Sequence, residues 1–396
     1  MRTITLQRDR DIPTRRRHPW LFSRSIARQS GGDENGQVEG RDESGAFLAR
    51  GFASPRSPIA ARWWTFSDEP VDAAFVERRI DDALALRAAV VPDQTDGYRV
   101  VNAEGDSLPG LVVDRYGAVL AVQATTEGTE RARPLWLPAL RGRFPEAVIV
   151  QKNDLPSRAG EGLPTADELL AGAALPALAA FRERGLSFFA DVAGGQKTGF
   201  FLDQRENRDL VRRHAAGRRV LNLFAYSGAF GVAALAGGAE RVTEVDVSAS
   251  ALALARENHL ANGQAVEGPE ARAAFVAADA FEDLRARVAA GETWDLVVTD
   301  PPAFAKRKGD LDRACRGYKD VGRLALKLLA PGGLLLACSC SGPVDADLFQ
   351  KVLFAAALDA GVTARILEKR GAAPDHPVSI YCPEGEYLKA FLLRAA

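Results

Sequence analysis

The chain has 396 residues, 47% hydrophobic and 26% charged, a globular composition that excludes wholesale disorder and predicts two or three domains of about 150 residues. Its 51 Lys and Arg residues balance 52 Asp and Glu residues, which excludes a uniformly basic nucleic-acid coat. No apolar run reaches the roughly 18 residues of a membrane span and four cysteines are too few for a disulfide scaffold, so we expect a cytoplasmic protein without membrane contact.

The first third of the chain predicts two small structural regions. Short apolar runs separated by turns over residues 1–68 favour a small β-barrel. A helix over about 70–90 then precedes a compact α+β stretch. The strands expected here are 47–52, 59–65, 98–102, 111–114, 119–123 and 148–151, with a helix over 130–140. Residues 153–185 are rich in Gly, Pro and Ala and predict a loop or linker.

From about residue 187 the sequence alternates between strand and helix patterns. The expected strands are 219–224, 241–246, 275–277, 294–299 and 333–339, and the expected helices are 228–236, 248–262, 280–289, 313–329 and 344–360. Successive βα units predict a parallel, doubly wound α/β sheet. Ligands of such sheets bind beyond the carboxyl ends of the strands.

Acidic residues follow successive strands of this predicted sheet. Asp246 stands 22 residues after Phe224, where a carboxylate can accept the hydroxyls of a ribose, and Asp279 and Asp300 end later strands. The turn after the first strand lacks the G-x-G-x-x-G spacing of a pyrophosphate site. Any one Asp is more simply a helix N-cap, but acids in strand order without a phosphate loop favour S-adenosylmethionine (SAM) as the cofactor.

Several motifs give the chain a family resemblance. Asn222–Gly228, Glu244–Asp246, Asp279 and Asp300-Pro301-Pro302 resemble the ordered motifs of class I SAM-dependent methyltransferases. More narrowly, the whole chain resembles the RlmI family of 23S rRNA (cytosine-5) methyltransferases. The segments that carry this closer match are 17–20, 106–111, 197–205, 316–320, 339–341 and 383–385.

The resemblance implies a domain order and a set of site residues. It implies a PUA-like RNA-binding domain over 1–70, a central α+β domain with a linker over 71–186, and a Rossmann-like methyltransferase domain over 187–396. It also implies a homodimer and 23S rRNA as a partner. The cofactor contacts that we predict are Lys197, Thr198, Phe200, Gln204, Arg205, Asn222, Phe224, Tyr226, Gly228, Asp246, Val247, Asp279, Ala280 and Asp300.

Two basic segments predict where RNA binds. Residues 1–30 hold eight Arg against two Asp, and residues 301–330 hold eight Lys or Arg against three Asp. Such patches on a neutral chain favour directional binding to a polyanion, although a solvated arginine face explains the first segment equally well. The predicted RNA contacts are Arg15, Arg16, Arg17, Lys306, Lys308, Arg316 and Lys319.

Cytosine-5 methylation needs a cysteine nucleophile, because carbon 5 becomes reactive only after a thiolate adds to carbon 6. Cys340 ends a predicted strand and matches the catalytic position of the family, with Asp300 expected to contact the base. Cys338 lies two residues back and is expected in the core, Cys315 is a weaker nucleophile candidate, and Cys382 is expected to pack. A zinc site from Cys338, Cys340, Cys382 and His376 is conceivable, but C-x-C alone is weak support, and we predict no metal.

Two alternatives remain open at this stage. Asp300-Pro301-Pro302-Ala303-Phe304 also resembles the motif of amine-directed methyltransferases, so a guanine or adenine N-methyltransferase is one alternative. Many RNA cytosine-5 methyltransferases place a second Cys where this chain has Ala303, so a two-cysteine release mechanism is not assumed. A noncatalytic RNA-binding assembly factor is the other alternative, and neither of the two needs Cys340.

Overall fold

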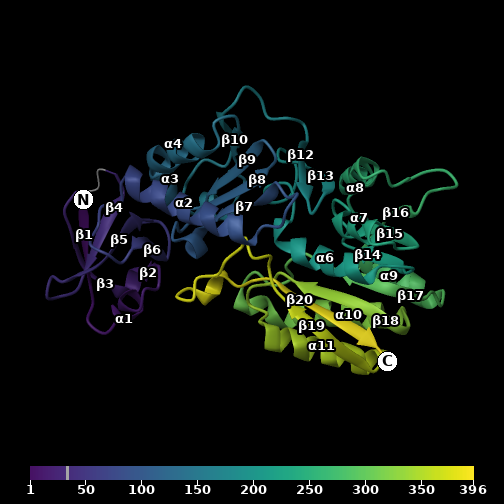
Figure 1. Cartoon of the computed structure of the whole chain (residues 1–396). Helices are drawn as coiled ribbons and strands as arrows, with labels where there is room; N and C mark the ends of the chain where they lie inside the picture. Colours follow the sequence, from purple (N-terminus) through teal and green to yellow (C-terminus); the bar gives the residue numbers. More distant parts are fainter. Residues whose placement is uncertain (33–34) are drawn as a thin grey trace. The chain divides into compact units, whose positions relative to one another are not determined.

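The computed structural model describes residues 1–32 and 35–396. The chain groups into two compact units, whose elements are labelled in Figure 1. The first unit comprises residues 1–184, 190–200 and 374–385, and the second comprises 185–189, 201–373 and 386–396. Both units are therefore assembled from segments that are distant in sequence. The boundaries of the three domains expected from the sequence stay a prediction.

The first unit begins with a six-stranded mixed sheet of order β2-β6-β5-β4-β1-β3. Its elements are β1 (Arg2–Leu6), α1 (Ile12–Arg15), β2 (Trp20–Phe22), β3 (Ile26–Ser30), β4 (Gln37–Arg41), β5 (Phe47–Ala53) and β6 (Ile59–Thr65). β1 and β4 run parallel, whereas the other neighbours are antiparallel. Alternate apolar side chains, among them Ile4, Val38 and Trp63, fill the interior.

A five-stranded sheet of order β11-β10-β9-β8-β7 follows, with α2 and α4 in contact with each other. The strands of this sheet and the helices around them are α2 (Ala73–Val90), β7 (Gly97–Asn102), β8 (Leu111–Tyr116), β9 (Val119–Ala124), α3 (Glu127–Arg131), α4 (Arg133–Arg143), β10 (Val148–Gln151), α5 (Pro156–Gly160) and β11 (Glu168–Ala171). β12 (Ala179–Glu183) follows in the chain and lies outside this sheet. The expectation of a loop over 153–185 is wrong, because α5, β11 and β12 lie within it. The expected single helix over 130–140 is replaced by α3 and α4, which adjoin at Ala132.

A segment close to the carboxyl end of the chain completes the first unit. Arg87 of α2 donates to the Asp106 carboxylate at 2.5 and 2.7 Å and to the backbone oxygen of Asp375 at 2.8 Å. Asp375 in turn accepts a hydrogen bond from the Arg99 backbone N–H at 2.9 Å. Arg87 and Asp375 are both buried, so residues 374–385 are an integral part of this unit.

The second unit contains a seven-stranded sheet of order β16-β15-β14-β17-β18-β20-β19. The five strands from β16 to β18 are parallel, and β20 runs antiparallel to both β18 and β19. The strands are β14 (Arg219–Leu223), β15 (Arg241–Asp246), β16 (Ala273–Ala277), β17 (Trp294–Thr299), β18 (Leu329–Ser339), β19 (Ala364–Arg370) and β20 (Lys389–Ala395), while β13 (Leu186–Ala190) lies outside this sheet. Strand order reverses between β14 and β17, so the switch point of the sheet lies there.

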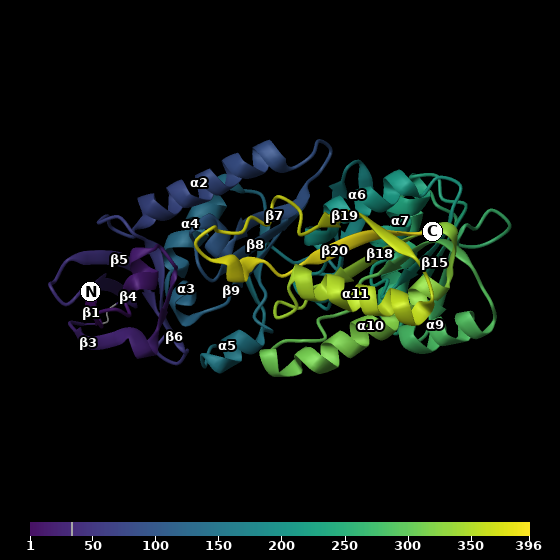
Figure 2. The ribbon, with the colours of Figure 1, turned by 90° about the horizontal axis from the view of Figure 1, so that it is seen from below.

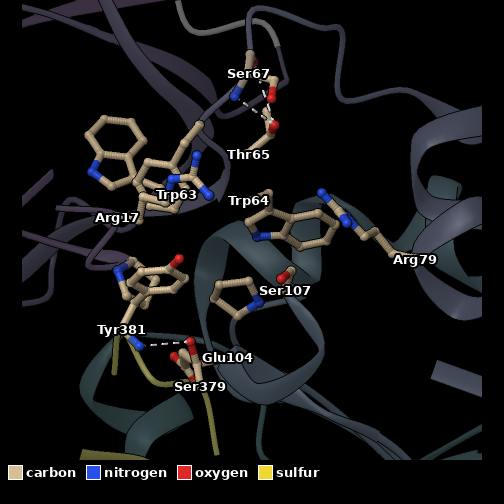
Figure 3. Close-up of a pocket in the computed structure, with 13 residues that line it drawn as sticks. Arg17, Trp63, Trp64, Thr65, Ser67, Arg79, Glu104, Ser107, Ser379 and Tyr381 are labelled. Carbon is tan, nitrogen blue, oxygen red and sulfur yellow. Dashed lines mark hydrogen bonds between the residues drawn. The ribbon is translucent and has the colours of Figure 1, made fainter. Parts of the chain in front are cut away.

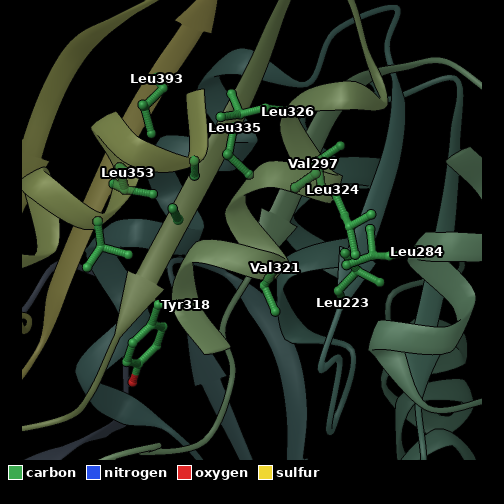
Figure 4. Close-up of a cluster of buried hydrophobic side chains, with 14 of the residues drawn as sticks. Leu223, Leu284, Val297, Tyr318, Val321, Leu324, Leu326, Leu335, Leu353 and Leu393 are labelled. Carbon is green, nitrogen blue, oxygen red and sulfur yellow. The ribbon is translucent and has the colours of Figure 1, made fainter. Parts of the chain in front are cut away.

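Helices cover both faces of this sheet (Figure 2). They are α6 (Arg205–His214), α7 (Ala229–Ala236), α8 (Ala249–Ala261), α9 (Ala280–Ala289), α10 (Leu311–Lys327) and α11 (Ala346–Ala360). Side chains of α9, α10 and α11 pack with Leu335 and Phe391 into one core cluster, part of which Figure 4 shows. Side chains of α6 and α7 pack with Leu336 and Leu392 into another. Neighbouring strand residues thus point to opposite faces, which confirms the doubly wound architecture.

Among the described residues, no helix is both long enough and apolar enough to cross a bilayer. β19 and β20, at one side of the sheet, were not predicted from the sequence. β20 is buried along almost its whole length, whereas β19 at the edge alternates between exposed and half-buried residues.

Candidate active site

The candidate site lies at the carboxyl ends of β14 and β17, where the strand order reverses. The chain that leaves β14 makes a strained turn, with φ of +59° at Phe224, +46° at Tyr226 and +68° at Gly228. This left-handed backbone is costly for non-glycine residues and is found mostly where surrounding contacts enforce it. At Gly228 a Cβ atom would also lie only 2.7 Å from the Cβ of Ala255, so only glycine fits.

Asp246, at the tip of β15, holds that turn in place. Its Oδ2 accepts a hydrogen bond from the Tyr226 backbone N–H at 2.9 Å, and its Oδ1 accepts one from Ser248 at 2.9 Å. An ionised carboxylate offers about four lone-pair positions, so two remain for the hydroxyls of a ribose. The next residue, Val247, is 77% exposed and offers apolar surface to a base. These residues therefore fit the adenosine part of SAM.

Glu244, two residues before Asp246 on β15, belongs to a buried polar network. Glu244 accepts from Asn222 Nδ2 at 2.7 Å and contacts His259 Nε2 at 3.0 Å, and all three side chains are buried. Burial raises the pKa of Glu244, and its hydrogen bonds to His259 and Asn222 oppose that rise. Asn222, predicted as a cofactor contact, is 1% exposed. Its Nδ2 is held by the Glu244 carboxylate, and its contact with the cofactor stays a prediction.

Asp279 caps a helix, as the simpler interpretation of an acid at a strand end proposes. Its Oδ1 accepts hydrogen bonds from the backbone N–H groups of Phe281 at 2.9 Å and Glu282 at 3.1 Å, at the start of α9. The residue is nonetheless exposed, and the described residues supply no hydrogen bond to its Oδ2. Asp279 can therefore cap α9 and still bind a ligand. Its neighbour Ala280 is buried, at 5% exposure.

Aromatic side chains border the strained turn. Phe224 is half-buried and meets Phe281 edge to face, with ring centroids 6.3 Å apart. Tyr226 meets Phe201 in the same way at 5.3 Å. Phe201, the neighbour in sequence of the predicted contact Phe200, thus lies beside the turn.

Two other predicted cofactor contacts, Gln204 and Arg205, stand at the start of α6. Both side chains are buried, at 2% and 0% exposure. Gln204 Oε1 accepts a hydrogen bond from Asn207 Nδ2 at 2.5 Å, and Arg205 Nε lies 3.2 Å from Glu206 Oε1. Their contact with a cofactor stays a prediction.

Lys197, Thr198 and Phe200 belong to the first unit, whereas Phe201, Gln204 and all later candidate residues up to Cys340 belong to the second. Thr198 Oγ1 donates to Asp114 Oδ2 at 2.6 Å and lies 2.9 Å from the Tyr116 hydroxyl. Phe200 is 2% exposed and packs edge to face against Phe181 at 4.9 Å. The Phe200 ring thus packs within the first unit, and its contact with the cofactor stays a prediction. The prediction for Lys197 and Thr198 stays open.

The ends of β17 and β18 bring the two predicted catalytic residues into neighbouring segments. Cys340 follows β18, is half-buried, and has its Sγ 3.7 Å from the backbone oxygen of Pro301, the residue after Asp300. The loop after Asp300 is fixed because Ser341 Oγ accepts from the Ala305 N–H at 3.0 Å and lies 2.8 Å from the Tyr318 hydroxyl. This geometry holds a thiol at the carboxyl edge of the sheet, next to the loop that begins at Asp300.

The other cysteines are less suited to nucleophilic chemistry. Cys338 is 1% exposed within the core, and burial raises its pKa well above the ordinary value. Burial and Asp312 also raise the pKa of Cys315 on α10. In the first unit, burial raises the pKa of Cys382 to about 12. Its sulfur lies within 4.8 Å of ligand atoms of His18 and Glu384, so it groups with residues outside the zinc set considered from the sequence.

Lys389 was not predicted as a site residue. It is 4% exposed on β20, and its Nζ donates to the backbone oxygens of Ser341 and Tyr387, each at 2.6 Å. Burial lowers its pKa to about 8, while the nearby Cys340 thiol opposes that decrease. The signal in the sequence was a single lysine within the apolar run from Leu388 to Leu393. Lys389 therefore places a cation beside the candidate nucleophile.

In the first unit, only part of the predicted arginine cluster is available for RNA. Arg15 is engaged in ion pairs with Asp11 at 2.7 Å and Asp42 at 2.5 Å, whose hydrogen bonds raise its pKa. Arg16 and Arg17 are exposed, and no described carboxylate pairs with either. Arg15 is thus held in ion pairs within the first unit, while RNA binding and a solvated arginine face both stay open as interpretations of Arg16 and Arg17.

In the second unit, the predicted RNA contacts Lys306, Lys308 and Arg316 are exposed and have no ion pair with a described residue. Lys319 instead pairs with Asp359 of α11 at 2.6 Å. The first three side chains therefore remain candidates for phosphate contacts, and Lys319 is the weakest of the four.

Comparison with known proteins identifies both parts of the chain. Residues 145–394 match the family model of S-adenosylmethionine-dependent methyltransferases, and residues 4–66 match that of PUA-like domains. The chain is 43% identical over 394 residues to ribosomal RNA large subunit methyltransferase I of Klebsiella pneumoniae, covering 99% of this chain and 98% of that protein. It is 44% identical to the protein of the same name from Yersinia pseudotuberculosis, with the same coverage.

Solved structures show the same fold. A structure from Streptococcus mutans, described as a candidate SAM-dependent methyltransferase, is similar over all of both chains with a TM-score of 0.83 and 23% identity. A candidate methyltransferase complexed with SAH gives a TM-score of 0.84 at 23% identity, again over the full length of both chains. The fold expected from the sequence is thereby confirmed. The cofactor of this protein is SAM. The chain belongs to the S-adenosylmethionine-dependent methyltransferases and, within them, to the family of ribosomal RNA large subunit methyltransferase I.

Proposed function

We propose that this protein transfers a methyl group from SAM to carbon 5 of a cytosine in large-subunit (23S) ribosomal RNA. The names of its relatives support a large-subunit rRNA substrate. The single observation that carries the choice of carbon 5 is the half-buried Cys340 thiol, 3.7 Å from the Pro301 carbonyl at the carboxyl edge of the sheet. Methylation of an exocyclic amine needs no thiol there.

In the proposed mechanism, Cys340 acts as a covalent catalyst. Its thiolate adds to carbon 6 of the cytosine, and the new C–S bond makes carbon 5 an enamine-type nucleophile. SAM, when bound, supplies an electrophilic methyl group. Carbon 5 takes up that group, then loses its proton to a base, and the electron pair of the C–H bond re-forms the double bond and expels the Cys340 thiolate.

Asp300 and Lys389 assist this chemistry in different ways. We propose that Asp300 contacts the exocyclic amine and ring nitrogen of the cytosine. The cytosine ring can then accept a proton as negative charge develops on it. The buried Lys389 cation favours the thiolate form of Cys340, since a neighbouring positive charge stabilises a thiolate. Ala303 stands where many related enzymes carry a second cysteine, so release does not use a thiol at that position.

The first test compares two cysteine variants. Cys340→Ala should fold, bind SAM and bind RNA but transfer no methyl group to rRNA fragments. Cys338→Ala is the matched control, because Cys338 is on the same strand but buried, and it should retain activity with at most a packing cost. Full activity of Cys340→Ala would favour the amine-directed alternative, which the Asp300–Phe304 motif supports. Complete inactivity of the wild-type protein on every rRNA substrate would favour a noncatalytic assembly factor.

The second test traps the intermediate. RNA that contains 5-fluorocytosine should remain bound covalently, because fluorine cannot leave as the proton does. Peptide mass spectrometry should locate the adduct on Cys340. An adduct on Cys315 would preserve the chemistry but overturn the assignment of the nucleophile.

The proposal includes the partners expected from the family. We propose that residues 1–70 contribute RNA affinity, that the protein acts as a homodimer, and that it works in the cytoplasm on rRNA. Binding through phosphates predicts a steep decrease in RNA affinity with rising salt. A protein that carries both Arg16→Gln and Arg17→Gln should show a weaker dependence of RNA affinity on salt. The proposed homodimer is tested separately by light scattering, which should report the mass of two chains.

A further inference from the structure

The first unit contains a cavity that the proposed catalytic chemistry does not use. It encloses about 260 Å³ and is lined by Arg17, by Trp63 and Trp64 of β6, by Arg79 of α2, by Ser107, and by Tyr381 from the segment 374–385 (Figure 3). Pockets for drug-sized ligands measure about 300–1,000 Å³. This smaller cavity therefore suits a single nucleotide base rather than an oligonucleotide.

The walls of the cavity are aromatic and positively charged. Tyr381 is 43% exposed, so its ring is an accessible stacking surface, and the Arg17 guanidinium lies 5.8 Å from the centre of that ring. Trp63 and Trp64 are almost fully buried and contribute only part of their surfaces to the wall. An exposed aromatic ring next to an arginine is the arrangement on which unstacked bases bind.

Two hydrogen-bond donors of the wall have no acceptor among the described residues. Trp64 Nε1 and Arg79 Nε are buried, and neither has a hydrogen-bond partner among the described residues. The nearest carboxylate oxygen to the Arg79 guanidinium, Asp82 Oδ2, is 3.8 Å away, which is too long for a hydrogen bond. The Glu104 carboxylate in the same wall accepts from Trp20 Nε1 at 2.8 Å. A buried donor without an acceptor is costly, so a ligand that supplies acceptors is favoured here.

We propose that this cavity binds one unpaired nucleotide of the RNA substrate, with its base stacked on Tyr381 and its phosphate facing Arg17 and Arg79. The inference rests on the proposed function, because it takes RNA as the ligand. It goes further in assigning a second RNA-binding site, separate from the residues proposed for catalysis. Such a site would fix the position of a single-stranded segment and thereby favour RNA with an unpaired nucleotide at one defined place.

The test measures binding of the full-length protein to a fluorescently labelled 12-nucleotide oligouridylate, with polyphosphate of matched charge as the second probe. Tyr381→Leu should weaken oligouridylate binding about tenfold, since stacking on an aromatic ring contributes about 1–3 kcal/mol per base, and should leave polyphosphate binding unchanged. Tyr381→Phe keeps the ring and should behave like the wild type. Arg17→Gln should weaken binding of both probes. Arg16 is a neighbouring exposed arginine that does not line the cavity, so Arg16→Gln should cause a smaller loss of affinity for each probe.

The outcomes separate this inference from the proposed function. If Tyr381→Leu weakens oligouridylate binding but the wild-type protein does not methylate cytosine, the cavity stands and the catalytic proposal falls. If Tyr381→Leu binds both probes as the wild type does, with an unchanged melting temperature, the nucleotide site is refuted even if methylation persists. An equal loss for both probes would also refute it, because a pure phosphate contact does not need a stacked base.

Discussion

Glu244 and His259 share one proton in the interior of the second unit. His259 Nε2 lies 3.0 Å from Glu244 Oε1, and neither side chain is exposed. On the other side of the ring, Nδ1 lies 2.6 Å from Gln264 Oε1, and Gln264 Nε2 donates to the Val232 backbone oxygen, which fixes the orientation of that amide. Nδ1 must therefore donate, and a single proton remains between Nε2 and Glu244. This arrangement supports the strand from which Asp246 emerges.

The Glu244–His259 contact predicts the effect of two substitutions at Glu244. Glu244→Ala leaves Asn222 Nδ2 and His259 Nε2 without a partner, and it should lower the free energy of unfolding by about 3 kcal/mol. Glu244→Gln keeps both contacts, because its amide donates to Nε2 and its oxygen accepts from Asn222, and it should cost about 1 kcal/mol or less. Urea unfolding followed by circular dichroism measures both. Equal stability of the two variants would contradict the shared-proton network.

Asp246 should control the affinity for the cofactor. Asp246→Ala removes the carboxylate expected to bind the ribose and should weaken binding of S-adenosylhomocysteine by about 1.5–3 kcal/mol, the range for hydrogen bonds to charged groups. Isothermal titration calorimetry measures this change. Asp347→Ala, which removes an exposed carboxylate paired with Lys351, is the control and should bind normally. Unchanged affinity of Asp246→Ala would remove this residue from the site.

Asp279 allows capping to be separated from ligand binding. Asp279→Ser retains an oxygen that can cap α9, so the protein should keep its melting temperature, whereas Asp279→Ala should lose about 1 kcal/mol of stability. If the carboxylate also contacts the cofactor, both variants should bind S-adenosylhomocysteine more weakly. Normal binding by Asp279→Ser would leave Asp279 with the capping role alone.

Lys389 predicts the pH dependence of Cys340 reactivity. With a pKa of about 8, Lys389 is mostly protonated at pH 7, so Cys340 in the wild type should react with iodoacetamide severalfold faster than in Lys389→Met. Above pH 8 the lysine loses its charge, and the two rates should converge. Quantitative mass spectrometry of the Cys340 peptide measures the rates. Cys315 in the same samples is the internal control, because Lys389 does not contribute to its pKa shift. A constant ratio at all pH values would exclude this role.

The lowered pKa of Lys389 also predicts how the free energy of unfolding depends on pH. Because the folded protein lowers the pKa of Lys389 from 10.5 to about 8, the unfolded chain binds more protons between these values. The contribution of Lys389 to stability should therefore increase as pH rises from 8 to 10.5. Over this range, the free energy of unfolding of the wild type should rise relative to that of Lys389→Met.

Elements with strong local patterns were predictable from the sequence. Strands 241–246 and 294–299 and helix 280–289 have the predicted bounds, because continuous apolar runs or helical spacing end at clear turn or capping residues. The edge strand Ala364–Arg370 was missed because charged residues occupy most of it. The segment 153–185 was predicted as a loop because Gly and Pro residues separate its helix and strands. These elements are short, and only their contacts with other parts of the fold stabilise them.

Candidate site residues could be named from the sequence where a single residue stands at the end of a predicted strand. Asp246, Asp279 and Cys340 follow strands whose order the sequence indicates. The partners of Glu244 come from β14 and α8, which only the folded sheet brings together. The contact of Lys389 with the segment after β18 depends on β20 lying antiparallel beside β18, with Lys389 opposite Ser339, and no local pattern encodes that register. Phe200 and Phe201 are adjacent in sequence, and only the structure assigns them to different units.

The contribution of residues 374–385 to the first unit has a consequence for synthesis of the chain. Domains generally fold from the N-terminus as the polypeptide emerges from the ribosome. Here Arg87 and the Arg99 amide find their partner Asp375 only after a further 288 and 276 residues have been made. The first unit must therefore wait, with a buried arginine still missing one acceptor, until residues 374–385 emerge. A nonsense codon between positions 201 and 373, within the second unit, would thus damage the first unit as well as the second.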